Sequence, residues 1–130
     1  MRAGVLSAAI MLALCEPSYA ANWEYTREAE PGKPMVVWRY YNWTKDCKEL
    51  GGVVKVLVKP EHGRLSKERV VAPVVGNRLN PADPCIGKVV PGLFVSYTSA
   101  PDYRGADKFV IERTLSNGRV DVDTFIMEVR

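Results

Sequence analysis

The most constraining feature of the chain is the segment 97–109, which reads Tyr-Thr-Ser-Ala-Pro-Asp-Tyr-Arg-Gly-Ala-Asp-Lys-Phe. A strand pattern ends there, a tight turn sets Tyr103 beside Gly105, and a new strand pattern opens at Asp107. Two β-rich runs follow and are joined across residues 116–118. Short strands separated by such turns are typical of an all-β sandwich. The pattern indicates an architecture and leaves the chemistry open.

The first twenty residues have the features of a secretory signal peptide. Arg2 supplies a positive charge, residues 5–14 form an apolar region too short to cross a bilayer, and small residues precede Ala21. We therefore expect cleavage before Ala21 and export to the periplasm or the cell exterior. Cys15 raises the alternative of a lipidated cysteine, but the bulky Leu14 stands where such a site needs a small residue.

The remaining residues, 21–130, suffice for one domain and are too few for two. The formal net charge is +3, and Lys and Arg are interleaved with Glu and Asp along the chain. Nucleic-acid binding normally requires a basic stripe, so we expect no nucleic-acid partner. No later segment is apolar for long enough to span a membrane. We therefore expect no membrane insertion after signal cleavage.

Two cysteines, Cys47 and Cys85, remain after the signal peptide. In an exported domain they most simply form one disulfide, which would stabilise the fold by about 4 kcal/mol in the chain-entropy model. Free thiols and a metal pair are the alternatives. A metal site would need further ligands, and the chain has a single histidine, His62. We predict no metal site and no cofactor.

Strand patterns alternate with polar segments between residues 22 and 72. We expect strands at 35–41, 53–59 and 64–72, where β-branched and aromatic residues are enriched or alternate with polar ones. We expect a lead-in or loop at 22–34, a loop or short helical turn at 43–52, and a turn at 60–63.

Residues 73–92 contain four prolines and three glycines. Each proline removes a donor from a strand ladder, so this segment should not lie in a central strand. We expect a long loop here, with at most one short edge strand near residues 86–90. The expected disulfide at Cys85 would hold the loop in place.

Strand patterns return at 93–98, 107–115 and 119–129. Asn117 and Gly118 suit the positive φ angles of a tight hairpin. In the last strand, the apolar residues change parity between Val122 and Phe125. This change predicts a β-bulge near residues 123–124.

Two motifs resemble those of bacterial cadherin-like, immunoglobulin-like repeats. Pro60-Glu61-His62-Gly63-Arg64-Leu65 is similar to their Pro-x-His-Gly turn, and segment 97–109 is similar to their Tyr-x-Pro…Tyr-x-Gly-x-Asp-x-Phe signature. The resemblance covers roughly residues 50–130. It implies an all-β, immunoglobulin-like (cadherin-like) sandwich of about seven strands, acting as a binding or spacer module. The single copy, the cysteine pair and an apparent insertion between Gly63 and Tyr97 depart from the family pattern.

The same motif residues have a structural explanation. Tyr103 would pack under the turn with its hydroxyl bonded to backbone, Gly105 would allow a positive φ, and Phe109 would enter the core. We therefore assign them a structural role.

Candidates for catalysis and for metal binding are weak. His62 falls in an expected exposed turn, and no nucleophile, zinc-protease or phosphate-loop motif accompanies it. We expect no enzyme and no catalytic residue. Asp102, Asp107, Asp121 and Asp123 fit no EF-hand spacing. We expect Asp121 and Asp123 to be solvated.

Half of the chain's aromatic residues fall between residues 23 and 43. Trp38 and Tyr40 share one strand face, whereas Tyr41 and Trp43 share the other. The second pair should cover a sheet edge, pack on the disulfide loop or contact a partner. Loops on a rigid scaffold often carry recognition. We therefore predict a partner-binding surface made by Tyr41, Trp43, Asn77, Arg78 and Asn80.

These observations favour an exported, non-catalytic module that binds a protein or glycan in the periplasm or at the cell surface. A small secreted enzyme inhibitor and a structural module of the cell envelope are the alternatives. We expect Trp43→Ala, or deletion within residues 77–83, to abolish binding while leaving thermal stability nearly unchanged.

Overall fold

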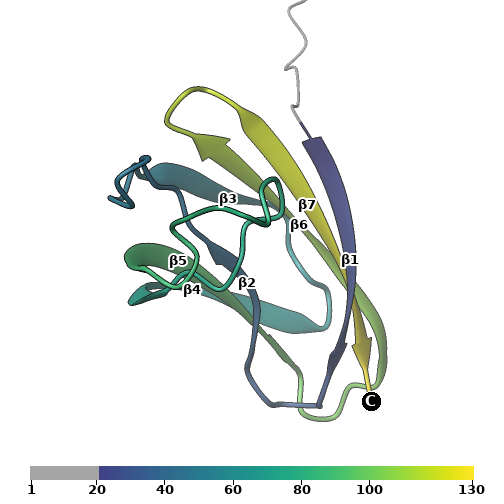
Figure 1. Cartoon of the computed structure of the whole chain (residues 1–130). Helices are drawn as coiled ribbons and strands as arrows, with labels where there is room; N and C mark the ends of the chain where they lie inside the picture. The colour runs from purple at the N-terminus through teal and green to yellow at the C-terminus, as the bar shows by residue number, and fades with distance from the viewer. Residues whose placement is uncertain (1–20) are drawn as a thin grey trace, which may run out of the picture.

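The computed structural model describes residues 21–130. The expected signal peptide, residues 1–20, lies outside the described residues. Residues 21–130 form seven strands: β1 (Ala21–Ala29), β2 (Met35–Tyr40), β3 (Gly52–Val58), β4 (Gly63–Pro73), β5 (Val89–Ser99), β6 (Gly105–Leu115) and β7 (Val120–Val129). They make two sheets, ordered β1-β7-β6-β3 and β2-β5-β4, that face each other as a sandwich (Figure 1). The predicted all-β sandwich of about seven strands is confirmed.

Strand β1 was not expected, because its sequence is rich in charged residues. Its side chains nevertheless alternate, with Trp23 and Tyr25 turned inward and Glu24 and Thr26 exposed. The strand pairs in parallel with β7, so the first and last strands of the domain lie side by side (Figure 1). The prediction of a lead-in or loop at residues 22–34 is wrong over most of its length. A period of two mattered more than the polar composition.

The long loop is shorter than predicted. It runs over residues 74–88, and β5 already begins at Val89, in the centre of the three-stranded sheet. Pro91 can lie in this strand because β2 pairs with β5 only from Leu93 onward. Pro91 therefore has β4 on one side, opposite Val71, and no strand on the other.

The bulge predicted in the last strand is absent: β6 and β7 pair without interruption from Gly105↔Val129 to Thr114↔Val120. Asp121 and Asp123 share the inward face with Phe125, and both aspartates are 0% exposed. The expectation of solvated carboxylates is therefore wrong. The inward positions keep the same parity along the whole strand. The sequence suggested a change of parity because the first inward positions are occupied by aspartates and not by apolar residues. The register shifts instead within β2 and within β3.

The hairpin between β6 and β7 forms where predicted. Gly118 has a φ of 84° and donates its amide to Leu115 O at 2.9 Å, whereas Asn117 has no positive φ. Asn117 instead accepts the Arg119 amide through its side-chain oxygen at 3.0 Å. A positive φ is thus needed at one position of this turn.

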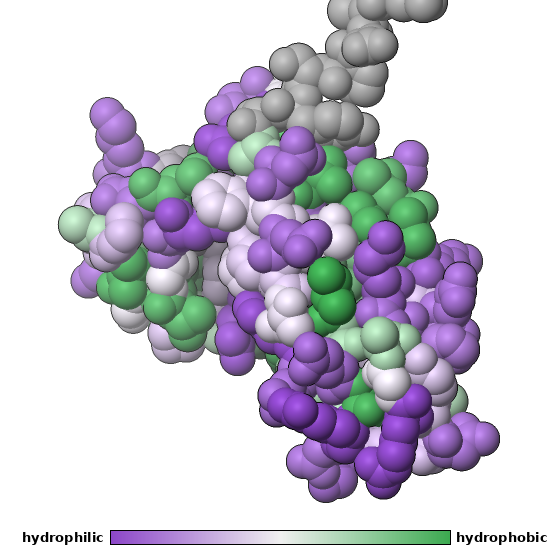
Figure 2. Space-filling model, turned by 90° about the vertical axis from the view of Figure 1, so that its right-hand side faces the viewer, coloured by the Kyte–Doolittle hydropathy of each residue, from purple (hydrophilic) through white to green (hydrophobic). Residues whose placement is uncertain are grey.

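The core between the sheets is aromatic. Phe109 stacks on Phe125 with ring centroids 5.0 Å apart and on Tyr97 at 5.8 Å. Tyr25 continues the stack, 5.3 Å from Phe125 and 4.5 Å from Trp38. On the outer face shown in Figure 2, hydrophobic patches are separated by hydrophilic side chains. Within residues 21–130 we find no helix long and apolar enough to cross a membrane.

The two sequence motifs meet around Asp107, in what we call the Asp107 cluster (Glu61, His62, Tyr97 and Asp107). Asp107 accepts the Tyr97 hydroxyl at 2.8 Å, the Glu61 amide at 3.0 Å and the His62 amide at 3.1 Å. The carboxylate therefore ties the turn before β4 to the start of β6.

Tyr103 lies beside the Asp107 cluster. Its ring stacks on the exposed His62 with centroids 3.9 Å apart, and its hydroxyl donates to Ala106 O. Gly105 has a φ of 131°, which strongly favours glycine. Phe109 is fully buried. These contacts agree with the structural role assigned to the motif.

Candidate binding site

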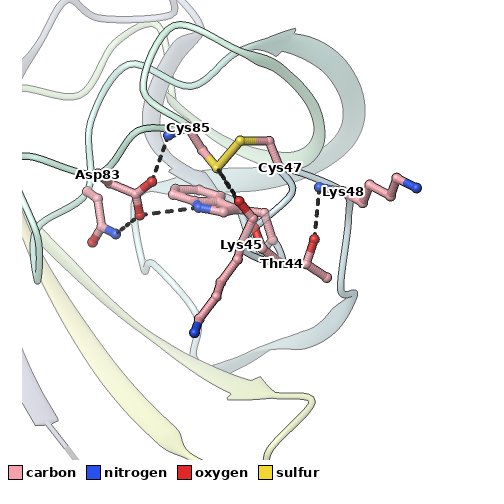
Figure 3. Close-up of a disulfide and its surroundings, with 8 residues drawn as sticks. Thr44, Lys45, Cys47, Lys48, Asp83 and Cys85 are labelled. Atoms are coloured by element: carbon pink, nitrogen blue, oxygen red, sulfur yellow. Dashed lines mark hydrogen bonds between the residues drawn. A yellow bond between two sulfur atoms is a disulfide. The ribbon is translucent and has the colours of Figure 1, made fainter.

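The predicted disulfide between Cys47 and Cys85 is present, with the Cα atoms 5.4 Å apart. It fastens loop 74–88 to the segment that follows β2 (Figure 3). Asp83 reinforces this connection by accepting the Cys85 amide at 2.8 Å, the Asn77 side chain at 2.9 Å and Trp43 Nε1 at 3.3 Å. The hydrogen bond from the Cys85 backbone amide is the main cause that lowers the pKa of Asp83, so this carboxylate stays charged.

Tyr41 and Trp43 pack on the disulfide-linked loops. Tyr41 is 7% exposed, and its ring makes edge contacts with Trp43 at 6.1 Å and Phe94 at 5.9 Å. Its hydroxyl donates to Pro73 O at 3.2 Å. A Cβ on Gly92 would lie 2.7 Å from the Tyr41 ring, so this close packing requires glycine. Of the roles considered for this pair, packing on the disulfide loop is the one that the structure displays.

Arg78 extends from loop 74–88 into the sandwich. We call the end of the sandwich at which this loop lies the open end. Its guanidinium donates to Asp123 Oδ1 at 2.8 Å, to the Tyr25 hydroxyl at 2.7 Å and to Asp121 Oδ2 at 3.2 Å. Arg119 completes the pairing of Asp121 at 2.9 Å. The Tyr40 hydroxyl donates to Asp123 Oδ2 at 2.8 Å. We call these groups the Arg78 cluster: Tyr25, Tyr40, Arg78, Arg119, Asp121 and Asp123.

Arg78 also lies close to two aromatic rings. Its guanidinium carbon lies 4.7 Å from the Trp23 ring and 5.6 Å from the Trp38 ring. Burial disfavours its charge, but Asp123 and Tyr25 more than offset this effect and raise the pKa of Arg78. Burial and the adjacent Asp123 also raise the pKa of Tyr40. The Arg78 side chain is 16% exposed, so most of it serves as an internal anchor for the loop.

Arg113 lies next to this cluster without a carboxylate partner among residues 21–130. It donates from Nη1 to Tyr41 O at 3.2 Å, and its guanidinium carbon lies 5.9 Å from the Tyr40 ring. Its buried Nε has no hydrogen-bond partner in the described part of the chain. Burial, and then repulsion from Arg78, lower the pKa of Arg113. Arg113 is therefore a guanidinium with unused donors.

A cleft of about 240 Å³ lies between loop 74–88, the end of β2 and the end of β6. Four of the five predicted partner-binding residues line it, namely Tyr41, Trp43, Asn77 and Arg78. Asn80 does not; it is exposed and accepts the Ala82 amide at 3.2 Å. The other lining residues were not predicted, and they include Trp38, Arg39 and Arg113. The sequence offered no signal for Arg113, because its role depends on neighbours from β2 and loop 74–88.

The remaining candidates do not form a second site of comparable detail. His62 lines a separate cleft beside Glu61 and Lys108, near the Asp107 cluster. In residues 21–130 no group of three or more His, Cys, Asp or Glu side chains is placed to hold a metal ion.

The chain matches no protein-family model and no curated protein. Among solved structures it is similar to the solution structure of amebosin, with 13% sequence identity and a TM-score of 0.46. The superposition covers 85% of this chain and 97% of amebosin. The likeness is distant and extends to the β-sandwich fold alone.

Proposed function

We propose that the chain is an exported, non-catalytic binding module that captures a glycan in the cleft beside the disulfide-linked loops. The observation that carries this proposal is the meeting of Tyr41, Trp43, Asn77 and Arg78 on one cleft. They come from two loops far apart in the sequence, joined by the Cys47–Cys85 disulfide. A cleft that combines aromatic surface with a few fixed polar groups suits a small polar ligand.

The setting of the cleft also supports recognition. Loop 74–88 folds back onto the sandwich, held by the disulfide at one point and by Arg78 at another. A loop fixed in this way loses little conformational freedom on binding. Because loop 74–88 folds back onto the sandwich, it is also less suited to insertion into the cleft of an enzyme. This makes the alternative of an enzyme inhibitor less favourable.

Location and family follow as parts of the same proposal. The apolar segment and small residues within 1–20 support export to the periplasm or cell surface. The likeness of the two motifs to bacterial cadherin-like repeats supports a binding or spacer module, and the Asp107 cluster gives those motifs a common structural purpose. The absence of any recognised catalytic motif in the sequence supports a non-catalytic role.

A protein partner is the second candidate. Val75 and Leu79, both on loop 74–88, are 69% and 52% exposed. Exposed aliphatic side chains beside a cleft suit a protein surface better than a sugar.

The test compares two exposed positions on a glycan array. Leu79 lines the cleft, whereas Leu57 on β3 is 40% exposed and lines none of the clefts described above. We expect Leu79→Glu to reduce glycan capture and Leu57→Glu to leave it unchanged, with equal melting temperatures. Equal capture by both variants would remove the cleft from the proposal. Capture of a protein, and of no glycan, by native cross-linking would favour the second candidate.

A further inference from the structure

The cleft continues into a larger one of about 440 Å³ that shares Trp38, Arg39 and Asn77 with it. We call the two together the arginine groove. Arg27 lies on the lining of the larger cleft, Arg113 on that of the smaller, and Arg39 on both. Among residues 21–130, none of these three arginines forms a salt bridge.

The three arginines share one further property, because each guanidinium lies against an aromatic ring. The distances from guanidinium carbon to ring centroid are 5.3 Å for Arg27 on Tyr25, 5.2 Å for Arg39 on Phe94 and 5.9 Å for Arg113 on Tyr40. A ring contact engages the face of a guanidinium and leaves its in-plane N–H donors available. Those donors match the two oxygens of a carboxylate.

The acidic groups nearby do not use these donors. Asp121 and Asp123 bind Arg78 and Arg119. Asp83 accepts from Trp43, Asn77 and the Cys85 amide. The groove therefore presents three guanidinium groups that have no carboxylate bound to them among the described residues.

We propose that the arginine groove binds an acidic oligosaccharide, with uronate-type carboxylates on Arg39 and Arg113 and a sugar ring against Trp43 or Trp38. This inference rests on the proposed function and specifies its ligand. The arginines are distributed along the groove instead of converging on one point, which suits a chain with one carboxylate per sugar better than a single phosphate group. Ring contacts hold each guanidinium before binding, so less side-chain entropy is lost.

The decisive experiment is calorimetric titration of the processed chain with tetragalacturonate and with its methyl ester. The two have the same backbone and differ in carboxylate charge. We expect binding of the acid at least about tenfold tighter than of the ester, with affinity falling as salt is added. Poly-glutamate of similar length is titrated in parallel, and we expect weaker binding because it offers no sugar ring.

Arg113→Met and Arg39→Met test the two proposed carboxylate contacts, with Arg104→Met as the matched control. Arg104 is exposed, precedes β6 and lines neither cleft of the groove. We expect each groove variant to weaken uronate binding about tenfold and Arg104→Met to leave it unchanged. Arg39→Lys keeps the charge but loses the planar fork, and it should recover only part of the loss.

Arg113→Met also separates binding from folding. The variant removes the Nη1 bond to Tyr41 O, but it also removes a buried Nε without a partner and puts an apolar side chain of similar length in its place, so the melting temperature should change little. Unfolding of this variant would move the test to Arg39→Met, whose side chain is exposed.

Several results would overturn the inference: equal affinity for acid and ester, equal affinity for poly-glutamate, or no loss in either arginine variant. The proposed function would survive if a neutral glycan still bound and Leu79→Glu still reduced its capture. It would fail separately if no glycan depended on the cleft.

Discussion

Each end of the sandwich buries a tyrosine–aspartate pair, and the hydroxyl–carboxylate distance is the same in both. Tyr97 donates to Asp107 at 2.8 Å near one end, and Tyr40 donates to Asp123 at 2.8 Å near the other. The partners of the two carboxylates differ. Asp107 accepts its other bonds from the backbone amides of Glu61, His62 and Lys108, whereas Asp123 accepts its other bond from the guanidinium of Arg78.

This difference distinguishes the two ends of the sandwich, which we call the closed end, at the Asp107 cluster, and the open end, at the Arg78 cluster. Backbone amides are neutral and belong to the turn that they stabilise. The Asp107 carboxylate therefore needs no cationic side chain from a distant loop. The Arg78 cluster depends on a cation brought in by a loop of 15 residues, 74–88. Beside it stands Arg113, a further cation without a carboxylate among the described residues. We place ligand binding at this end because Arg113 lines a cleft there and its buried Nε has no hydrogen-bond partner among the described residues.

The largest expected effect is at Arg78. Arg78→Met leaves Asp123 without its guanidinium and Asp121 with Arg119 alone, inside an apolar sandwich. Removing one partner of a buried pair typically costs about 3–5 kcal/mol of stability. We expect a loss of that order in the free energy of unfolding, measured by chemical denaturation.

Arg104→Met is the control for Arg78→Met, because Arg104 is exposed. It should change the free energy of unfolding by less than about 0.5 kcal/mol. A similarly small change for Arg78→Met would mean that the open end does not depend on its loop. The contacts of Arg78 argue against the sequence-based expectation that deletions within 77–83 leave thermal stability nearly unchanged. A small change for Arg78→Met would instead agree with that expectation.

The closed end is tested at Asp107. Asp107→Ala leaves the Tyr97 hydroxyl and two turn amides without their acceptor, and bonds to charged groups contribute about 1.5–3 kcal/mol each. Water can reach the turn amides, so we expect a total loss of about 3 kcal/mol. Chemical denaturation of Asp107→Ala beside Asp102→Ala, an exposed aspartate, measures it. Equal stability of the two variants would show that the motif does not hold this end.

The sequence predicted the closed end better than the open one. The motif at residues 60–65 and the segment 97–109 are two short runs whose residues contact one another, and the turn types and strand starts can be read from them. The central strands, the hairpin and the Cys47–Cys85 pairing were likewise predicted correctly. Each depends on local alternation or on a simple count of cysteines.

The open end could not be read from local patterns. The inward residues of β7 begin with Asp121 and Asp123, and buried aspartates look like solvated ones until their cations are found. Arg78 is separated from Asp123 by 45 residues and lies in an irregular loop. Four of the five predicted binding residues line one cleft, whereas Asn80 does not, and Tyr41 is buried. Arg39 and Arg113 are visible as candidates only when the ring contacts are known.

A smaller effect is expected at Gly63, where the turn before β4 passes over the Tyr97 ring. A Cβ there would lie 2.6 Å from both the Tyr97 ring and Thr98 O, and backbone cannot easily yield. Gly63→Ala should therefore cost about 1–3 kcal/mol through overpacking. Gly76→Ala is the matched control, because a Cβ at Gly76 meets no atom within 4 Å. Comparable melting temperatures for the two variants would show that the closed end is looser than its geometry indicates.

The smallest effect concerns pH and the Asp83 carboxylate that joins the two loops of the open end. Bonds from the Cys85 amide and then Asn77 and Trp43 hold the pKa of Asp83 below its ordinary value of 3.8. A lowered pKa in the folded state means that ionised Asp83 stabilises the fold above that ordinary value, and that this contribution is lost as the pH falls through the folded pKa. Asp83→Asn removes the charge and keeps one of the two accepting oxygens, as protonation of the carboxylate does. Its melting temperature should therefore lie slightly below that of the natural chain at pH 7, and the difference should vanish under acid conditions. A difference that persisted unchanged at low pH would indicate that shape, and not the charge of Asp83, holds loop 74–88 to the segment after β2.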